Sequence, residues 1–578
     1  MKRLLQILRP AWLSVSLVIV LTFFQSLTTL YLPRLMADIV DYGVIKANMS
    51  YIYRIGAWML AVTILSAIFS VIAGFIASKT SAEFGQVLRN RVFRHAESMM
   101  PHEFDQLGTS SLIVRSTNDV MQVQQFINML LRMMVIAPLM ALGGIIMAVT
   151  TNWQLSWILF LILPVLALVV WGILRHGMAL FQLMQDKVDV LNRVVRENLT
   201  GIRIIRAFGR EDYEISRFAG ANGTLTDVAI RVNTLMAVLM PLVMLVVNLS
   251  TVAILWFGGH EVGSNTLQVG KLMAFIQYVT QILFSTMMVS AMFFMLPRSQ
   301  ASARRINEIL DFTPALKDNP SQESVPVSTL SHALLQFHDV SFQYPGAKSA
   351  VLSNVSFDVN PGSITAIIGG TGSGKTALLN LIPRFFDISC GVIKLSGIDI
   401  QSLPQQLLRS YVAYVPQKSV VFSGSIADNI RFGNPEATDE EIHKAAQIAQ
   451  AIEFIENLPG QFDFVVQQAG TNLSGGQKQR LAIARALVKR ARLYLFDDSF
   501  SALDYQTERR LLEALKDSLH DSAVILVSQR VHTVIDANPI LVLDGGHIAG
   551  MGTHEQLMKD SFVYQDIVRT QLSREASA

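Results

Sequence analysis

The sequence predicts two domains of different fold class: an α-helical transmembrane domain of six helices, followed by an α/β domain that contains a P-loop. Three observations lead to this prediction. The 578 residues are 51% hydrophobic and 16% charged, and their mean hydropathy of +0.40 is too high for an average soluble protein. Residues 1–300 hold 23 basic and 15 acidic residues, whereas residues 301–578 hold 24 and 29. A glycine-rich segment between an apolar strand and a helical pattern occurs in the acidic part.

Six uncharged apolar stretches in the first part are long enough to cross a membrane. A spanning helix needs about 20 mostly apolar residues, because it rises about 1.5 Å per residue through a hydrocarbon core of about 30 Å. The stretches lie between Arg9 and Arg34, between Arg54 and Lys79, twice within Met133–Leu174 on either side of a polar turn near Thr151, in Val232–His260 and in Leu272–Pro297. The first stretch is too long for a signal peptide and is expected to be retained.

Basic residues are concentrated in two long connections between the spans. Residues 79–132 carry six Lys and Arg and residues 175–231 carry nine, whereas the alternate connections carry three, none and one. Because cytoplasmic loops are rich in Lys and Arg, both long connections and the N-terminus are predicted to face the cytoplasm. Their amphipathic patterning indicates that the membrane helices continue into the cytoplasm. The expected location is the cell membrane, with a multi-pass topology and the second domain in the cytoplasm.

The remaining composition excludes several functions. Cys390 is the single cysteine, which excludes an intramolecular disulfide, a zinc–cysteine cluster and a cysteine-pair redox site. The net charge of +3 is too small to indicate a nucleic acid as a partner. Apart from His260, the spans contain no acidic or basic residue, so the energy source is expected outside the membrane rather than in an ion gradient.

A Pro- and Ser-rich segment separates the two predicted domains. Residues 313–332, which include TPALKDNPSQESVPVSTLS, have the composition of a linker. The transmembrane domain is therefore predicted at residues 1–312 and the nucleotide-binding domain at residues 333–578.

The segment GGTGSGKT fits the phosphate-binding pattern G-x-x-x-x-G-K-[ST], and it lies between a strand and a helix as that pattern requires. Glycines let backbone N–H groups surround phosphate oxygens at a helix N-terminus. The predicted nucleotide-binding residues of this segment are Gly369, Gly370, Thr371, Gly372, Ser373, Gly374, Lys375 and Thr376. Lys375 is expected to reach the β- and γ-phosphates, and the Thr376 hydroxyl to bind Mg²⁺. A second apolar strand, in RLYLFDD, ends on Asp497, whose carboxylate is also expected to hold Mg²⁺.

Between these two motifs lies NLSGGQKQR, and here the sequence resembles the ATP-binding cassette (ABC) transporters. The resemblance extends to YVPQ with Gln417, to SALD at Ser501–Asp504, and to Tyr344 as the aromatic that stacks on adenine. It implies ATP and Mg²⁺ as ligands, with Gln417 as a further Mg²⁺ ligand, and a dimer of two half-transporters in the lipid bilayer. In such a dimer the signature residues serve the partner's ATP in trans: Leu473, Ser474, Gly475, Gly476 and Gln477.

Two positions depart from the family pattern. The residue after the Mg²⁺-binding acid is usually a glutamate that activates water, and here it is Asp498. Aspartate reaches less far by one methylene, and a misplacement of about 1 Å in a reacting group can cost about 100-fold in rate. The family's switch histidine is replaced by Gln529, which can donate a hydrogen bond but cannot carry a proton. His532 is expected in the following helix and is therefore no substitute.

These features resemble the degenerate-site subunit of a heterodimeric multidrug exporter. The expected function is ATP-driven export of small hydrophobic or amphipathic compounds by alternating access, with hydrolysis mainly at the partner's site. Two alternatives remain open. One is a homodimeric lipid or peptide exporter that hydrolyses ATP slowly with Asp498, and the other is an ATP-gated regulatory half with negligible hydrolysis.

Overall fold

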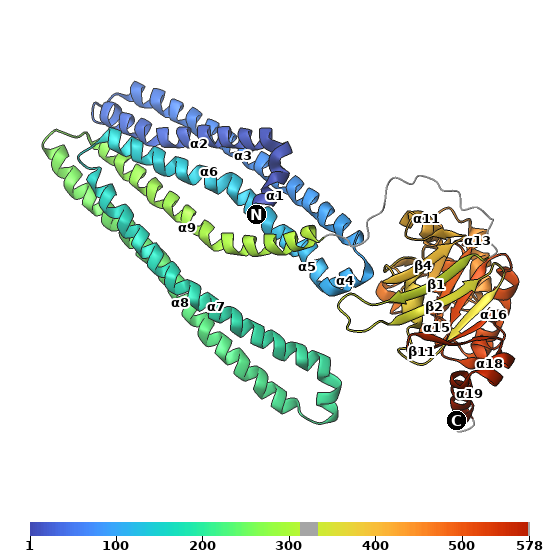
Figure 1. Cartoon of the computed structure of the whole chain (residues 1–578). Helices are drawn as coiled ribbons and strands as arrows, with labels where there is room; N and C mark the ends of the chain where they lie inside the picture. The colour runs from blue at the N-terminus through green and yellow to red at the C-terminus, as the bar shows by residue number, and fades with distance from the viewer. Residues whose placement is uncertain (313–332, 576–578) are drawn as a thin grey trace. The chain divides into compact units, whose positions relative to one another are not determined.

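The structure, a computed structural model, describes residues 1–312 and 333–575, which form two compact units (Figure 1). The first unit is built mainly from residues 1–312 and the second mainly from residues 333–575. The linker predicted at 313–332 lies outside the described residues. Each unit is described by itself.

The first unit is entirely helical in its described residues. Its α-helices are α1 (Lys2–Leu5), α2 (Trp12–Asp38), α3 (Met49–Glu97), α4 (Pro101–Leu107), α5 (Thr109–Val114), α6 (Val120–Thr151), α7 (Trp157–Ala207), α8 (Glu211–Gly263) and α9 (Val269–Asp311). A 3₁₀ segment, η1 (Gln6–Ala11), precedes α2, and two π-helical segments, η2 (Ile39–Val44) and η3 (Arg115–Asp119), follow α2 and precede α6.

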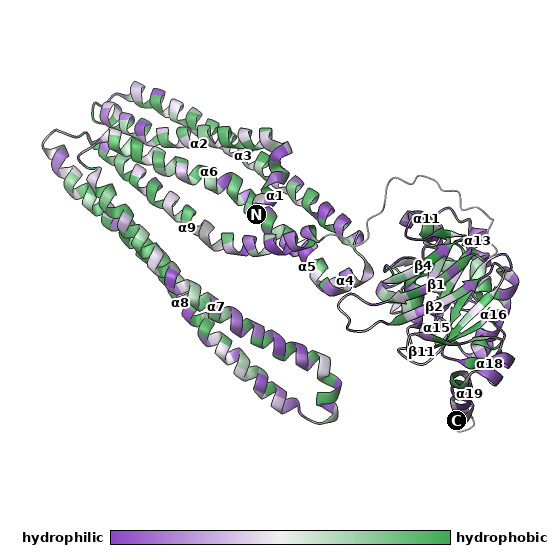
Figure 2. Cartoon of the chain, viewed as in Figure 1, coloured by the Kyte–Doolittle hydropathy of each residue, from purple (hydrophilic) through white to green (hydrophobic). Residues whose placement is uncertain are grey.

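Six helical stretches are long and apolar enough to cross a membrane, which confirms the predicted number. They are Arg3–Val44, Met49–Glu97, Thr109–Thr151, Trp157–Ala207, Glu211–Gly263 and Val269–Val289. The helices α3, α7 and α8 contain 49, 51 and 53 residues. At about 1.5 Å per residue they are roughly 75–80 Å long, more than twice the thickness of a hydrocarbon core. Figure 2 shows the consequence in α7 and α8, whose hydrophobic stretch gives way to a hydrophilic one toward the turn that joins them.

The helices of this unit form two groups. α2, α3, α6 and α9 pack against one another, whereas α7 and α8 form a long hairpin that diverges from them (Figure 1). The hairpin is joined to the bundle near Leu155 and Leu159, which are buried in one cluster with Phe275 and Tyr278 of α9. Farther along, Leu199, Ile204 and Phe208 are exposed. In the described residues, the hairpin therefore packs on the bundle near Leu155 and Leu159, and its far end extends away from the bundle.

An ion pair between a buried carboxylate and an exposed arginine joins η3 to α9. The Asp119 carboxylate is fully buried and accepts hydrogen bonds from Ser302 Oγ at 2.9 Å and from Arg305 Nε at 2.7 Å. Arg305 also donates through a terminal nitrogen, so the guanidinium is bidentate. Arg304, the preceding residue, points to solvent and approaches only Glu308, at 3.6 Å.

The second unit is an α/β domain with two main sheets. Its strands are β1 (Leu335–Phe342), β2 (Leu352–Val359), β3 (Ile364–Ile368), β4 (Cys390–Leu395), β5 (Ile398–Asp399), β6 (Val412–Val415), β7 (Gly424–Ser425), β8 (Val465–Val466), β9 (Leu493–Asp497), β10 (Ala523–Val527), β11 (Ile540–Asp544) and β12 (His547–Gly552). Its helices are α10 (Lys375–Leu381), α11 (Gln405–Ser410), α12 (Ile426–Arg431), α13 (Asp439–Ile448), α14 (Ile452–Glu456), α15 (Gly475–Leu487), α16 (Tyr505–Ser518), α17 (Val531–Val534), α18 (His554–Asp560) and α19 (Phe562–Glu575). Two short 3₁₀ segments are η4 (Gln461–Asp463) and η5 (Gln468–Gly470).

The larger sheet has six strands in the order β12-β11-β3-β10-β9-β6. All its pairs are parallel except β11 with β12. The smaller sheet, β2-β1-β4-β5, is antiparallel, and β7 and β8 form a separate pair. β10, and β9 up to its final Asp497, are continuous apolar runs rather than alternating ones, as expected for parallel strands that are buried on both faces.

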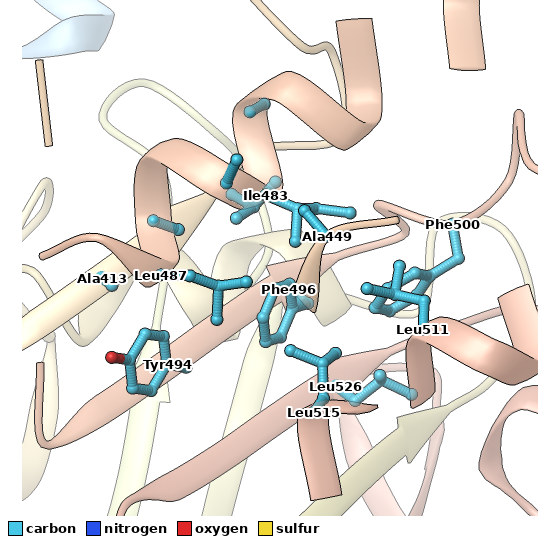
Figure 3. Packing of buried hydrophobic residues seen from close by; sticks show 14 of the residues in the cluster. Ala413, Ala449, Ile483, Leu487, Tyr494, Phe496, Phe500, Leu511, Leu515 and Leu526 are labelled. Carbon is cyan, nitrogen blue, oxygen red and sulfur yellow. The ribbon is translucent and has the colours of Figure 1, made fainter. Parts of the chain in front are cut away.

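The core of the second unit lies between the parallel sheet and its helices. Figure 3 shows Phe496 of β9 at the centre, with Ile483 and Leu487 of α15 on one side and Leu515 of α16 nearby. All four side chains are buried. This packing fixes α15, whose N-terminus carries the LSGGQ segment, against the strand that ends in Asp497.

We expect Arg305→Ala to lower the melting temperature of the purified chain by several degrees. Among the described residues, the substitution leaves the buried Asp119 carboxylate with Ser302 as its remaining side-chain donor, and removing a hydrogen-bond partner from a buried polar group costs about 1–3 kcal/mol. Arg304→Ala is the matched control, because exposed ion pairs contribute about 0–1 kcal/mol. Differential scanning fluorimetry measures both, and equal melting temperatures for the two variants would contradict the prediction.

Candidate functional site

Gly369 and Gly374 occupy positions of the P-loop where a side chain would be strained. A Cβ at Gly369 would lie 2.1 Å from the carbonyl oxygen of Leu543. Gly374 has a φ of 101°, in the left-handed region, and it caps the start of α10. Substitution at either glycine would therefore displace the loop that is predicted to surround phosphates.

Lys375 turns its ammonium group into this loop. Its Nζ donates to the carbonyl oxygens of Gly369 at 2.8 Å and Gly370 at 2.7 Å, and it approaches Ser373 Oγ at 3.3 Å. Burial lowers the pKa of the Lys375 ammonium from its ordinary value, while the nearby charge of Asp498 opposes this shift. A buried cation on a glycine-rich loop suits phosphate oxygens, which can replace the carbonyl partners.

Thr376 and Asp497 meet beside the loop. The Thr376 hydroxyl donates to Asp497 Oδ1 at 3.2 Å, and the Tyr414 hydroxyl donates to Asp497 Oδ2 at 3.4 Å. Asp497 is 2% exposed, and burial raises the pKa of its carboxyl. The adjacent Asp498 raises it further, whereas the Thr376 hydrogen bond lowers it. An ionised carboxylate here is therefore short of compensating positive charge.

This donor set fits a magnesium ion bound together with nucleotide phosphates. Mg²⁺ prefers a small number of hard oxygen ligands, typically one or two carboxylates completed by phosphate and water. Thr376, Gln417 and Asp497 could supply a hydroxyl, an amide and a carboxylate. A divalent cation would also offset the negative charge of Asp497 and Asp498, which the neighbouring side chains do not fully neutralise.

Asp498 lies at the predicted catalytic position, directly after β9. Its backbone N–H donates to Val527 O at 3.0 Å, and its φ of 45° is in the left-handed region, where aspartate is better tolerated than most residues. Gln417 Nε2 donates to its carboxylate across a long 3.5 Å. Burial raises the pKa of the Asp498 carboxyl, while the hydrogen bond from Gln417 and the charges of Arg530 and Lys375 lower it.

Gln529 follows the end of β10, and the backbone around it is held by a residue that sequence analysis missed. The Gln571 side chain in α19 donates from Nε2 to Gln529 O at 2.5 Å and accepts from the backbone N–H of Val531 at 2.8 Å. We call this arrangement the Gln571 clamp. Gln571 lies about forty residues farther along the chain in an unremarkable helical segment, so no motif signals it.

His532 lies in α17, as predicted, and does not replace the missing switch histidine. Its Nε2 lies 3.5 Å from the buried carboxylate of Glu508. That carboxylate also binds Arg530 at 3.0 Å and the Thr533 hydroxyl. These contacts connect α16, which follows the SALD segment, with the segment that follows Gln529.

The LSGGQ segment forms the N-terminus of α15. Ser474 Oγ accepts a hydrogen bond from the backbone N–H of Gln477 at 3.3 Å, and Gln477 Oε1 accepts from the backbone N–H of Ser474 at 2.8 Å, which is a capping box. Since a hydroxyl has one donor besides its acceptor sites, the Ser474 O–H stays available to a ligand. Gln479 Oε1 accepts from the backbone N–H of Ala502 at 3.0 Å and ties α15 to the SALD segment.

The described residues of the chain bring together only part of the predicted site. Lys375, Thr376, Asp497 and Asp498 converge with Gln417 at the carboxyl edge of the parallel sheet. Among the described residues, no hydrogen bond or ion pair joins residues 473–477 to the P-loop. Tyr344 is half-buried and packs edge-to-face on Phe342 and Phe386, with ring centroids 4.8 and 5.1 Å apart.

Six membrane helices followed by a P-loop domain with this site define an ATP-driven membrane transporter of half-transporter architecture. Comparison with protein families agrees. The family model described as ABC transporter transmembrane region matches residues 15–287, and the model described as ABC transporter matches residues 352–501.

Curated relatives match over nearly the whole chain. A protein named as an uncharacterised ABC transporter ATP-binding protein of Mycobacterium tuberculosis (strain CDC 1551 / Oshkosh) is 39% identical over 98% of this chain and 97% of its own. One with the corresponding name, from Bacillus subtilis (strain 168), is 37% identical over 100% of both chains. A protein named ATP-dependent lipid A-core flippase, from Thiobacillus denitrificans (strain ATCC 25259 / T1), is 30% identical over 99% of this chain and 98% of its own.

The chain belongs to the ABC transporter family. A solved structure described as a bacterial Atm1-family ABC exporter with ATP bound superposes with a TM-score of 0.78 over 98% of both chains, at 24% identity, and shows the exporter fold. The protein is thus a multi-pass membrane protein with a cytoplasmic ATP-binding domain that acts as an ATP-hydrolysing translocase.

We expect Asp497→Asn to abolish the response to ATP and Mg²⁺ without lowering the stability of the nucleotide-free protein. The pKa of Asp497 in the folded protein is raised above the ordinary value of 3.8. The folded wild type therefore loses stability as the pH rises from 3.8 through the raised pKa, because the buried carboxyl must then ionise. Asparagine does not ionise, so the variant does not lose this stability. The nucleotide-free variant should therefore melt at the wild-type temperature or higher at neutral pH. It should lose the further stabilisation that ATP with Mg²⁺ gives the wild type.

Thermal melts with and without ATP and Mg²⁺ measure both effects. Asp521→Asn, at an exposed carboxylate of the same domain, is the control and should keep the nucleotide response. A large fall in the melting temperature of nucleotide-free Asp497→Asn would contradict the stability argument, and a preserved nucleotide response would contradict the assigned role.

Proposed function

We propose that this chain is one half of a heterodimeric exporter of small hydrophobic or amphipathic compounds, and that the ATP site on its own P-loop turns over slowly or not at all. The observation that carries the proposal is the contrast between two sets of residues. The groups that bind nucleotide are complete, whereas Asp498 and Gln529 replace the two groups that hydrolysis requires.

Nucleotide binding is assigned to the converging groups. Lys375 exchanges its carbonyl partners for β- and γ-phosphate oxygens, and the P-loop N–H groups surround the phosphates. Thr376, Gln417 and Asp497 hold Mg²⁺, which supplies charge to the phosphates when it is bound. Tyr344 offers an aromatic face to adenine. In this assignment every binding group belongs to the unit formed by residues 333–575.

Slow ATP hydrolysis is expected because the Asp498 side chain is short, and not because its carboxylate is a weak base. Burial raises the pKa of Asp498, which by itself would make it a better proton acceptor. However, its side chain is one methylene shorter than glutamate, and rate falls about 100-fold for a misplacement of about 1 Å. Gln529 can donate one hydrogen bond to a γ-phosphate but adds no positive charge to the transition state.

A partner is expected because one chain supplies donors to only one face of the ATP. The Ser474 hydroxyl and the N–H groups at the start of α15 form a second donor surface, and within the described residues they have no bond to the P-loop. Placed against the partner's ATP, they would complete a hydrolysing site there. The exposed Leu199, Ile204 and Phe208 on the α7–α8 hairpin also favour burial against a second subunit.

The membrane unit contains a cavity suited to an amphipathic compound. It measures about 600 Å³ and opens between α2, α3 and α6, where Trp58, Leu65 and Ile146 contribute apolar walls. Among the described residues that line it, Arg34 alone carries a charge. An apolar cavity with a single cation favours a ligand that combines a hydrophobic body with an anionic group.

This cavity also keeps a second candidate function open, namely a homodimeric lipid flippase. The relative named ATP-dependent lipid A-core flippase supports that alternative. In a homodimer both ATP sites would carry Asp498 and Gln529, so ATPase activity would be very low. The two candidates thus differ in subunit composition before they differ in substrate.

Native mass spectrometry of the complex extracted from its own membrane tests the composition. We expect one 64.0 kDa chain with one different chain of similar size. Two identical chains would overturn the heterodimer and favour the flippase alternative.

Restoring the two catalytic residues tests the assigned defect. In the assembled transporter whose partner has lost its own catalytic carboxylate, Asp498→Glu with Gln529→His should raise ATPase activity about 100-fold. The matched control, Asp521→Glu with Gln447→His, changes exposed residues of the same types and should leave activity unchanged. If activity barely rises in the restored variant, the whole pocket rather than the two residues prevents hydrolysis, and the chain acts as a regulatory half.

A further inference from the structure

A basic pocket lies in the first unit where α1, η1, α3 and α9 meet. It measures about 360 Å³ and is lined by Arg3, Leu4, Ile7, Arg91, Arg94, His95, Ser98 and Leu310. Three of these residues are arginines and none is acidic. We call it the elbow pocket, after the bend that α1 and η1 form before the long apolar helix α2.

Within the part of the chain that the structure describes, two of the arginine side chains have no partner. Arg3 is paired with Asp311, whereas the guanidinium groups of Arg91 and Arg94 make no ion pair or hydrogen bond there. They lie three positions apart on α3 and therefore face the same side, where like charges repel. His95 and Ser98 continue this face. Two adjacent guanidinium groups thus lie at the rim of a cavity, and no carboxylate of the described residues is paired with either of them.

The floor of the elbow pocket is apolar. Leu4 is 1% exposed, and Ile7 and Leu310 are partly buried beside it. The volume is within the range of small-molecule sites and far larger than a bare phosphate ion needs. A ligand that fits both parts has an anionic head for the arginines and a carbon skeleton for the floor.

The pocket also lies beside the last described turn of the membrane unit. His95 Nε2 is 2.6 Å from the carbonyl oxygen of Phe312, and Arg3 binds Asp311 at the end of α9. A ligand on Arg91 and Arg94 would therefore join α3 to both ends of the described first unit, at α1 and at the end of α9.

We propose that the elbow pocket binds a phosphate-bearing anion, either the head group of an anionic phospholipid or a soluble phosphate ester. The planar guanidinium groups of Arg91 and Arg94 would each present paired N–H donors to phosphate oxygens, a geometry for which arginine is better suited than lysine. The two sources share this chemistry, and they differ in whether the ligand arrives from the bilayer or from the cytoplasm.

The test uses the full chain in its native assembly in nanodiscs. One arm compares phosphatidylcholine nanodiscs with nanodiscs that also contain phosphatidylglycerol, and the other adds glycerol 3-phosphate to phosphatidylcholine nanodiscs. We expect the melting temperature to rise in at least one arm. Since a hydrogen bond to a charged group is worth about one decade of affinity, Arg91→Gln with Arg94→Gln should lower affinity for the active probe about 100-fold.

A charge-matched control separates the pocket from general attraction to anions. Lys79→Gln with Arg89→Gln removes two positive charges from exposed positions of the same helix, outside the pocket, and should keep the response. Because the side chains of Arg91 and Arg94 have no hydrogen bond or ion pair among the described residues and repel each other, their variant should melt at the wild-type temperature or higher without the probe. A response to lipid alone identifies the bilayer as the source, and a response to glycerol 3-phosphate identifies a soluble ester. The proposal is overturned if neither arm responds or if both double variants respond alike.

Discussion

Val527 of β10 pairs with Asp497 of β9 on one side and with Ile367 of β3 on the other. This register brings the ends of three parallel strands to the same level. The chain segments that leave these ends are the P-loop, the Asp497–Asp498 pair and the segment that contains Gln529. A shift of one residue in either pairing would move Asp497 to the opposite face of the sheet and away from Thr376. The positions of the charged groups at the ATP site thus depend on backbone hydrogen bonds between strands whose side chains are mostly apolar.

The same edge concentrates charge that the fold does not compensate. Asp497 is buried, the adjacent Asp498 is half-buried, and the carboxyls of both have raised pKa values. Lys375 is buried close to them, but its ammonium group donates hydrogen bonds to backbone carbonyl oxygens instead of to the two carboxylates. Such an arrangement costs folding free energy, and a ligand that carries both Mg²⁺ and phosphates offsets that cost. Binding and domain stability are therefore expected to be coupled in this domain.

The sequence predicted the parts of this protein that depend on local pattern. The six helices follow from uncharged runs of sufficient length, and the convergence of Lys375, Thr376 and Asp497 follows from motifs that each end a strand or begin a helix. Other features depend on tertiary packing and could not be predicted. Neither the ion pair of the buried Asp119 nor the lack of a partner for the Arg91 side chain among the described residues has a local signal, because each depends on which residues of distant helices come close. The roles assigned to Asp498 and Gln529 remain predictions, because these residues are expected to change the rate of ATP hydrolysis, and a structure shows contacts rather than rates.

The Gln571 clamp has a consequence for the order in which the domain is completed during synthesis. Translation produces the P-loop, Asp497 and the Gln529 segment well before α19 leaves the ribosome. Until α19 docks, the carbonyl of Gln529 and the N–H of Val531 lack the side chain that holds them. A nascent domain can therefore assemble its sheet and its P-loop while the segment that contains Gln529 is still free to move. Docking of α19 then fixes the backbone of that segment.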